Sequence, residues 1–224
     1  RLQAMPQILE AMSGEMLYAT EKLDGCSATY FIRAKERSLW DRLLFRKPYD
    51  FGVCSRNLRI FPGQKESHHL GAYWEMAKKY DLESKLVRFW KEEHTDLAIQ
   101  GEIVGPGIQG NKYGLGEKRL FVYQIQSKGR YAEYSVLKYL TQSWGLEDVP
   151  ELELPDFPIT DGWSVDEWVV FSRGVSTLNP KIPREGIVVR TCEDLRDGTR
   201  HLPTVASRLS FKVINPEFLV KYDA

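Results

Sequence analysis

The chain has 224 residues, of which 42% are hydrophobic and 28% are charged, an ordinary composition for one large globular domain or two small ones with a buried core. Its 31 Lys and Arg residues balance 31 Asp and Glu residues, which excludes a polybasic histone-like protein but allows a basic cleft on a neutral body. The apolar runs are too short to cross a bilayer, and three scattered cysteines without a CxxC pair argue against a zinc or disulfide framework and for a reducing, intracellular compartment, most simply the cytoplasm.

The first half of the chain alternates between strand and helix patterns. Segments rich in β-branched and aromatic residues predict strands at 16–20, 27–32 and 51–54. The turn-forming pair Asp24-Gly25 predicts a tight bend that joins the first two strands. Apolar residues at helical spacing then predict two amphipathic helices at 70–80 and 82–90.

The second half of the chain continues this mixture. A strand pattern at 97–104 stops at Gly105-Pro106-Gly107, and Ser164 with Glu167 forms a capping-box signature for a helix through about residue 171. The remaining predictions are strands at 121–125, 186–190 and 209–214 and a helix at 134–144. Because strands and helices mix irregularly, we predict an α+β fold with mainly antiparallel sheets. Neither a GxGxxG nor a GxxxxGK[ST] motif is present.

The main candidate functional residue is Lys22, in the segment Glu21-Lys22-Leu23-Asp24-Gly25 at the corner between the first two predicted strands. Residues i and i+2 of a strand face the same side, so we expect Lys22 and Asp24 to project into one site. A lysine amine becomes a nucleophile only after it loses its proton, and burial or a nearby metal cation favours that loss. Taken alone, so short a motif is more often a surface Lys–Asp pair in a hairpin turn.

Several further segments follow Lys22 along the chain, and together they argue against the interpretation of Lys22 and Asp24 as an ordinary surface pair. They are Ser55-Arg56-Asn57, Gly101-Glu102 with the glycine-rich run 105–111, Phe121 to Ile125, Glu185 to Arg190, and Ser210-Phe211-Lys212. With the lysine motif, these segments resemble the motifs of the covalent nucleotidyltransferases, specifically the ATP-dependent RNA ligases. The stretches GEIVGPGIQGN and SFKVINPEFLVKY are most similar to nick-sealing RNA ligases of the ligase 2 and Deinococcus types.

This resemblance implies a nucleotidyltransferase (ATP-grasp-like) fold, in which two antiparallel β-sheets flanked by helices hold the nucleotide between them. It also implies a reaction of three steps. Lys22 attacks the α-phosphorus of ATP and forms a lysyl-AMP phosphoramidate, the AMP passes to an RNA 5′-phosphate, and an RNA 3′-hydroxyl displaces the AMP. Each step is an in-line phosphoryl displacement, so the site needs cations, a metal and an adenine slot.

The resemblance further implies a role for each matched residue. Lys212 would contact the α-phosphate, although relatives usually carry a KxK pair and this chain has Ser210 and Ile214 at the flanking positions. Mg²⁺ or Mn²⁺ would be held, partly through water, by three carboxylates: Asp24, Glu102 and Glu185. The nucleotide would be bound by Phe121 and Leu23 on the two faces of adenine, Glu21 through its backbone, Glu102 on the ribose, Glu185, Lys212 and Arg56.

The resemblance also bears on partners and domains. Residues 1–224 would form the adenylyltransferase domain of an RNA ligase that acts on nicked duplexes or on 5′-phosphate and 3′-hydroxyl ends, and we expect a monomer. Relatives join this domain to an accessory OB-type or helical module, and the start at Arg1 suggests an excised domain. Three alternatives remain: a DNA ligase, a GTP-dependent mRNA capping enzyme on the same scaffold, and a non-catalytic RNA-binding domain.

Overall fold

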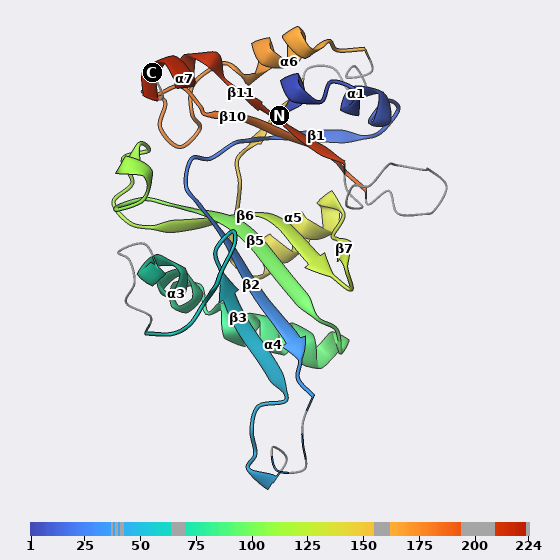
Figure 1. Ribbon diagram of the computed structural model, residues 1–224, viewed down its shortest axis with the longest axis vertical. Helices are drawn as coiled ribbons and strands as arrows, with labels where there is room; N and C mark the ends of the chain where they lie inside the picture. The colour runs from blue at the N-terminus through green and yellow to red at the C-terminus, as the bar shows by residue number, and fades with distance from the viewer. Residues whose placement is uncertain are drawn as a thin grey trace.

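The structure, a computed structural model, contains two β-sheets, each covered by its own helices (Figure 1). It describes residues 1–36, 38, 40, 43–63, 70–154, 162–193 and 209–222. The chain therefore has the α+β architecture with two mainly antiparallel sheets that the sequence predicts.

The smaller sheet has four antiparallel strands in the order β11-β10-β1-β9. Their bounds are Ser210–Ile214 (β11), Gly186–Thr191 (β10), Leu17–Glu21 (β1) and Glu151–Leu152 (β9). Helices lie over it at the top of Figure 1: α1 (Ile8–Ala11), α6 (Val165–Ser172) and α7 (Pro216–Tyr222). A 3₁₀ turn, Leu2–Ala4, precedes them. The Ser164–Glu167 capping box is present at the start of α6 and aims the fully buried Trp168 at this sheet.

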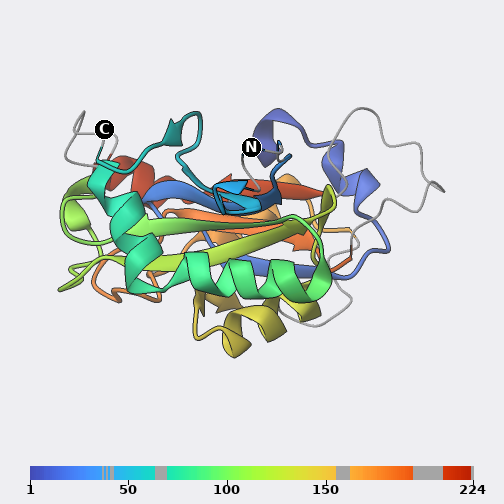
Figure 2. The ribbon, with the colours of Figure 1, turned by 90° about the horizontal axis from the view of Figure 1, so that it is seen from below.

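The larger sheet has seven strands, six of them in the order β4-β3-β2-β5-β6-β7, and β8 pairs in parallel with β6. The bounds are Arg59–Ile60 (β4), Tyr49–Cys54 (β3), Cys26–Ala34 (β2), Leu97–Val104 (β5), Arg119–Ser127 (β6), Arg130–Tyr131 (β7) and Glu147–Asp148 (β8). The helices beside it are α3 (Leu70–Lys79), α4 (Leu82–Glu93) and α5 (Tyr134–Ser143), and Figure 2 shows α4 crossing these strands. A second 3₁₀ turn, Gln109–Asn111, follows β5.

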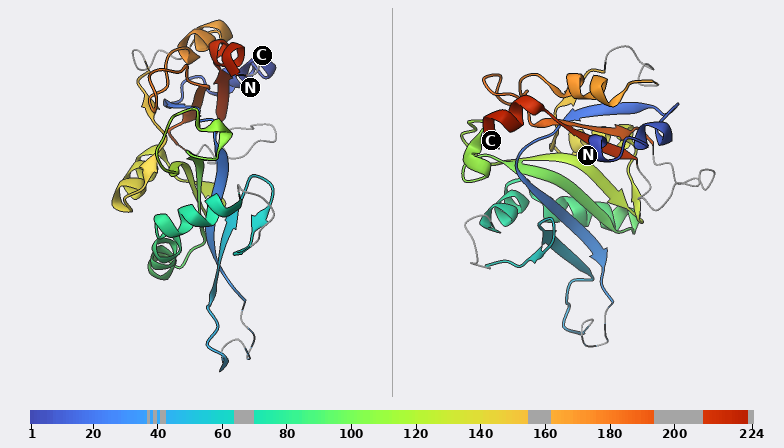
Figure 3. Two further views of the ribbon diagram at one scale, coloured as in Figure 1. Left: turned by 90° about the vertical axis from the view of Figure 1, so that its left-hand side faces the viewer. Right: turned by 45° about the horizontal axis from the view of Figure 1, so that its top comes forward.

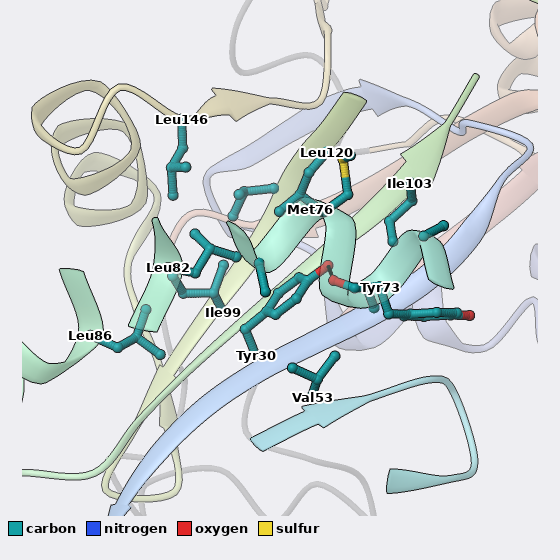
Figure 4. Close-up of a cluster of buried hydrophobic side chains, with 14 of the residues drawn as sticks. Tyr30, Val53, Tyr73, Met76, Leu82, Leu86, Ile99, Ile103, Leu120 and Leu146 are labelled. Atoms are coloured by element: carbon teal, nitrogen blue, oxygen red, sulfur yellow. Dashed lines mark hydrogen bonds between the residues drawn. The ribbon is translucent and has the colours of Figure 1, made fainter. Parts of the chain in front are cut away.

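The main core lies between this larger sheet and helices α3 and α4 (Figure 4). Tyr30 on β2 is fully buried there and donates a hydrogen bond from its hydroxyl to the carbonyl oxygen of Tyr73, at 3.0 Å. On β2 the even-numbered residues from Ala28 to Ile32 are buried, whereas their odd-numbered neighbours are only half-buried. The odd-numbered side chains therefore face away from this core, toward the other side of the sheet.

The segment Lys22–Gly25 does not form the hairpin turn that the sequence predicts. β1 pairs with β10 and β9, whereas β2 pairs with β3 and β5, so the segment crosses from the smaller sheet to the larger one (Figure 3). A Cβ atom on Gly25 would lie 2.3 Å from the carbonyl oxygen of Ile103, so only glycine fits where this link crosses β5. Lys22 and Asp24 therefore lie outside any strand, and their shared orientation comes from the link and not from strand alternation.

Two further findings concern features that the sequence analysis considered. The three cysteines are all free thiols, as their spacing predicts. In the part of the chain that the structure describes, the helices are all too short or too polar to serve as a membrane span.

Candidate active site

A cavity of about 870 Å³ contains most of the residues that the sequence singled out. Both sheets contribute to its walls, and Lys22 to Gly25 form part of its lining where they cross between the sheets. Its size lies within the range of small-molecule sites in proteins. The residues predicted from sequence that line it are Glu21, Lys22, Leu23, Asp24, Arg56, Glu102 and Lys212.

Lys22 is held by Glu185 and Gly186, at the start of β10. Its backbone N–H donates to the carbonyl oxygen of Gly186 at 2.9 Å, and its Nζ forms an ion pair with Oε1 of Glu185. Burial raises the pKa of the Glu185 carboxyl, and the Lys22 ammonium opposes that rise. Among the described residues, the buried Oε2 of Glu185 has no hydrogen-bond partner, so this carboxylate can accept a further ligand.

Two residues of the loop after β5, Lys112 and Tyr113, hold Asp24 in place. Its backbone N–H donates to the hydroxyl of Tyr113 at 2.6 Å, and its carboxylate forms an ion pair with Nζ of Lys112. The same Nζ lies 5.5 Å and 5.1 Å from the ring centroids of Phe218 and Tyr222 on α7. Lys112 was not predicted as a site residue, because no spacing rule connects this loop to the lysine motif.

Glu102 lies on β5, opposite Ser27 of β2, and faces the cavity. Burial raises the pKa of its carboxyl to about 8, and the Glu185 and Asp24 carboxylates contribute to that rise, while the Lys22 ammonium opposes it. The structure thus places Glu102 and Glu185 in the same electrostatic environment as Lys22, as the sequence series predicts.

Besides Lys22, four basic residues line the cavity: Arg1, Arg56, Arg190 and Lys212. The pKa of Lys212 is lowered by burial and by the nearby charges of Lys22 and Arg56. Arg190 donates to the hydroxyl of Thr20 at 3.1 Å. Arg190 ends the motif at 185–190 but was not predicted as a site residue. Ile214, one of the two positions flanking Lys212 where a second lysine was looked for, is a buried apolar residue.

Phe121 does not line the cavity, whereas Tyr123, two residues later on β6, does. Phe121 is only 3% exposed and packs in a small cluster with Leu23, Val104 and Tyr113, so its role as the adenine-stacking residue stays a prediction. Tyr123 lines the cavity instead, with its hydroxyl 2.8 Å from Oγ of Ser27. Tyr123 packs against the same cluster as Phe121, and it also lines the cavity, next to a register shift in the pairing of β5 with β6.

Glu21 is almost fully buried and works through its side chain as well as its backbone. Its Oε2 accepts a 2.7 Å hydrogen bond from the backbone N–H of Thr177, and its own N–H donates to the carbonyl oxygen of Pro150 at 2.8 Å. That N–H is therefore engaged within the protein, and the predicted backbone contact to an adenine edge would have to use another atom.

The carboxylates of Asp24, Glu102 and Glu185 offer the oxygen ligands that Mg²⁺ and Mn²⁺ prefer. No three His, Cys, Asp or Glu side chains of the described ranges are close enough together to hold a metal directly. The unpartnered Oε2 of Glu185 nevertheless provides one open ligand position. This arrangement fits an ion that keeps most of its water shell better than a closed protein cage.

Comparisons with known proteins agree with one another. The family model described as RNA ligase matches residues 15–214. A mutant of the Naegleria gruberi RNA ligase solved with ATP and manganese is 25% identical, with a TM-score of 0.71, and the match covers 98% of this chain and 55% of that one. The same ligase solved with pyrophosphate is 26% identical, with a TM-score of 0.72 and coverage of 100% and 56%. The chain thus spans little more than half the length of these structures. No curated protein sequence matches it.

Proposed function

Because the chain belongs to the RNA ligase family, we propose that it is the adenylyltransferase domain of an ATP-dependent RNA ligase. The observation that carries this proposal is the position of Lys22. It lies in the wall of a cavity between two sheets, beside the carboxylates of Glu185 and Glu102 and near the ammonium of Lys212. A Lys–Asp pair in a surface turn would have neither a cavity wall nor these charged groups around it.

In the first step, the deprotonated Nζ of Lys22 attacks the α-phosphorus of ATP, forming a P–N bond as the bond to pyrophosphate breaks. In the second, an oxygen of an RNA 5′-phosphate attacks the same phosphorus and Nζ leaves. In the third, an RNA 3′-hydroxyl attacks the activated 5′-phosphate and AMP leaves with the electron pair. Such displacements depend mainly on positioning and on neutralising phosphate charge.

The residues of the cavity are suited to these needs. Lys22 must leave its ion pair with Glu185 before it can attack. Lys212 and Arg190 provide positive charge for phosphate oxygens, and the ring of Tyr123 offers a stacking face for adenine.

A divalent ion would be held by Glu185 and Glu102, with Asp24 free to join once Lys112 is displaced. When bound, it would neutralise phosphate charge and stabilise the uncharged form of Lys22. Mn²⁺ appears with ATP in the matched Naegleria structure, which supports this choice of ion.

Two wider points belong to the same proposal. Residues 1–224 would act with an accessory module, which is supported by the 55–56% coverage of the matched ligases. RNA with 5′-phosphate and 3′-hydroxyl ends would be the substrate. Free cysteines and the use of ATP both fit an intracellular, most simply cytoplasmic, compartment.

The test is covalent labelling. The chain is incubated with [α-³²P]ATP and Mn²⁺ or Mg²⁺ and run on a denaturing gel, with Lys22→Ala as the control. A labelled band that needs both metal and Lys22 supports the proposal. Labelling by [α-³²P]GTP instead would favour a capping enzyme. No labelling by either nucleotide, from a folded protein, would favour a non-catalytic RNA-binding domain. A sealing assay on DNA and RNA nicks then separates the two kinds of ligase.

A further inference from the structure

A strip of alternating aromatic and arginine side chains continues from the cavity along the open face of the larger sheet. We define the arginine–phenylalanine strip as five residues of β2, β3, β4 and the segment after β4: Phe31, Arg33, Asp50, Arg59 and Phe61. Thr29 lines the cavity, and Phe31 is the next β2 residue on the same face. Leu58 also lines the cavity, and Arg59 follows it. The strip therefore begins where the cavity ends.

Phe31 is half-buried and has small residues opposite it on both neighbouring strands. Its partners across the sheet are Gly52 on β3 and Ala98 on β5. A Cβ atom on Gly52 would lie 2.2 Å from the Phe31 ring, so the ring lies directly over the backbone of that glycine. Any larger residue at position 52 would move the ring.

Two guanidinium groups flank this ring and are held in place by one carboxylate. Cζ of Arg59 lies 5.3 Å from the ring centroid of Phe31 and 5.4 Å from that of Phe61, and Cζ of Arg33 lies 5.5 Å from that of Phe31. Asp50 accepts hydrogen bonds from both arginines, at 2.5–2.9 Å from Arg59 and 3.0 Å from Nε of Arg33. Asp50 fixes the orientation of both arginines, and the group of three carries a net charge of about +1.

We propose that the arginine–phenylalanine strip binds the single RNA strand that leaves the cavity, by stacking its bases and attracting its phosphates. Aromatic rings interleaved with arginines are the usual platform for single-stranded nucleic acid. The net positive charge of the strip matches a phosphate backbone, and its continuity with the cavity places a strand end near Lys22. This inference rests on the proposed function, because it names where that function would hold its RNA.

The experiment measures RNA affinity separately from chemistry. Binding of a fluorescently labelled, 5′-phosphorylated single-stranded RNA to the 224-residue chain is followed by anisotropy across a salt series. Two variants change the strip: Phe61→Ala, at a ring that is 57% exposed, and Arg59→Gln. Their matched controls lie on helices away from it: Tyr139→Ala, exposed on α5, and Arg88→Gln, exposed on α4. Lysyl-AMP formation is measured on every variant.

Phe61→Ala should weaken RNA binding by about 5-fold or more, the effect of losing one base–aromatic stack. Arg59→Gln should also weaken it and make the salt dependence shallower by about 0.7 to 1 in log–log slope, the loss of one phosphate contact. Arg59→Lys should keep the slope and lose part of the affinity, because lysine keeps the charge without the planar stacking face. Both control variants and all lysyl-AMP rates should stay within twofold of the wild type.

RNA affinities of the strip variants within twofold of the controls would overturn the inference, and would leave the strip as a face for a protein partner. That result would not affect the proposed function if lysyl-AMP still forms. Conversely, loss of RNA affinity in a chain that never forms lysyl-AMP would support the strip and contradict the ligase. Thermal denaturation is measured on both variants, so that a loss of RNA affinity is counted only where the protein is still folded at the assay temperature.

Discussion

The two sheets meet at one cavity but contribute different chemistry to it. The smaller sheet brings Arg190 and Lys212, and the Lys22 nucleophile directly follows its strand β1. The larger sheet contributes the carboxylate of Glu102, the hydroxyl of Ser27 and the aromatic ring of Tyr123. Every residue of β1 is buried, whereas β2 alternates between buried and half-buried positions and carries the strip outward.

This difference indicates a division of labour in the proposed reaction. The smaller sheet would neutralise phosphate charge, the larger sheet would hold the adenosine and the RNA strand, and carboxylates from both would hold the metal. The sheet that does the charge chemistry is closed to solvent on β1, where low dielectric strengthens charge interactions. The sheet that does the holding keeps one face open, as recognition of a long polymer requires. The four predictions that follow test this division, from the largest expected effect to the smallest.

Loss of Lys22 should have the largest effect. Lys22→Ala should reduce lysyl-AMP formation by at least ~1000-fold, because the reaction has no other nucleophile. Lys22→Arg should fail as well, since a guanidinium stays protonated. Both proteins should fold normally by circular dichroism, because the side chain borders a cavity. Adenylylation of Lys22→Ala at the wild-type rate would remove this residue from the mechanism.

Substitutions of Tyr123 and Phe121 on the larger sheet should affect different properties, ATP affinity in the first case and stability in the second. Tyr123→Ala should weaken ATP binding by about 1–3 kcal/mol, the scale of base–aromatic stacking, with Tyr123→Phe retaining most of the affinity. Phe121→Ala should instead lower the free energy of unfolding by about 3–5 kcal/mol, because that ring is packed in a core cluster. Calorimetric ATP titration and urea unfolding measure the two quantities. The reverse pattern would restore Phe121 as the stacking residue.

The three carboxylates test whether the two sheets share the metal. Asp24→Ala, Glu102→Ala and Glu185→Ala should each raise the Mn²⁺ concentration for half-maximal adenylylation by about 10-fold. Glu92→Ala, on the outer surface of α4, is the matched control. Metal midpoints that stay at the wild-type value in all three variants would return these residues to structural or ribose-binding roles.

The pKa of Glu102 predicts a smaller effect on stability. The folded protein raises this pKa from 4.5 to about 8, so between those pH values the folded state binds more protons than the unfolded state. Its free energy of unfolding should therefore fall as pH rises through this window, by at least about 1 kcal/mol. Glu102→Gln should flatten that part of the curve. Urea unfolding in EDTA between pH 5 and 8 measures it; a wild-type stability that rises over this range would contradict the assignment.

Much of the fold was accessible from the sequence, because its signals are local. The strand at 97–104 coincides with β5, and the Ser164–Glu167 pair caps α6 as expected, since a capping box involves only four residues. Lys22, Glu102 and Lys212 were found as cavity residues because each lies in a short motif whose order along the chain could be compared with a known family.

What the sequence did not reveal depends on pairing between distant segments. Asp24-Gly25 has the composition of a hairpin turn, and only the pairing of β1 with β10, about 170 residues away, makes it a link between sheets. Phe121 and Tyr123 lie only two residues apart on β6, and the tertiary packing together with a shift in the pairing with β5 leaves Tyr123, and not Phe121, in the cavity lining. Lys112 reaches Asp24 through a loop whose left-handed glycines no periodicity describes.

The four-residue link from Lys22 to Gly25 also has a mechanical consequence. It ties the end of β1 to the start of β2, so those two points cannot separate by more than about 18 Å however the sheets move. If the two sheets move relative to each other, this link limits their separation on the side of the cavity where Lys22 lies. The cavity mouth could then widen to admit ATP or an RNA end while Nζ of Lys22 keeps nearly the same place relative to both walls. Lys22, which lies on this link, would then react from nearly the same position in the steps that involve it.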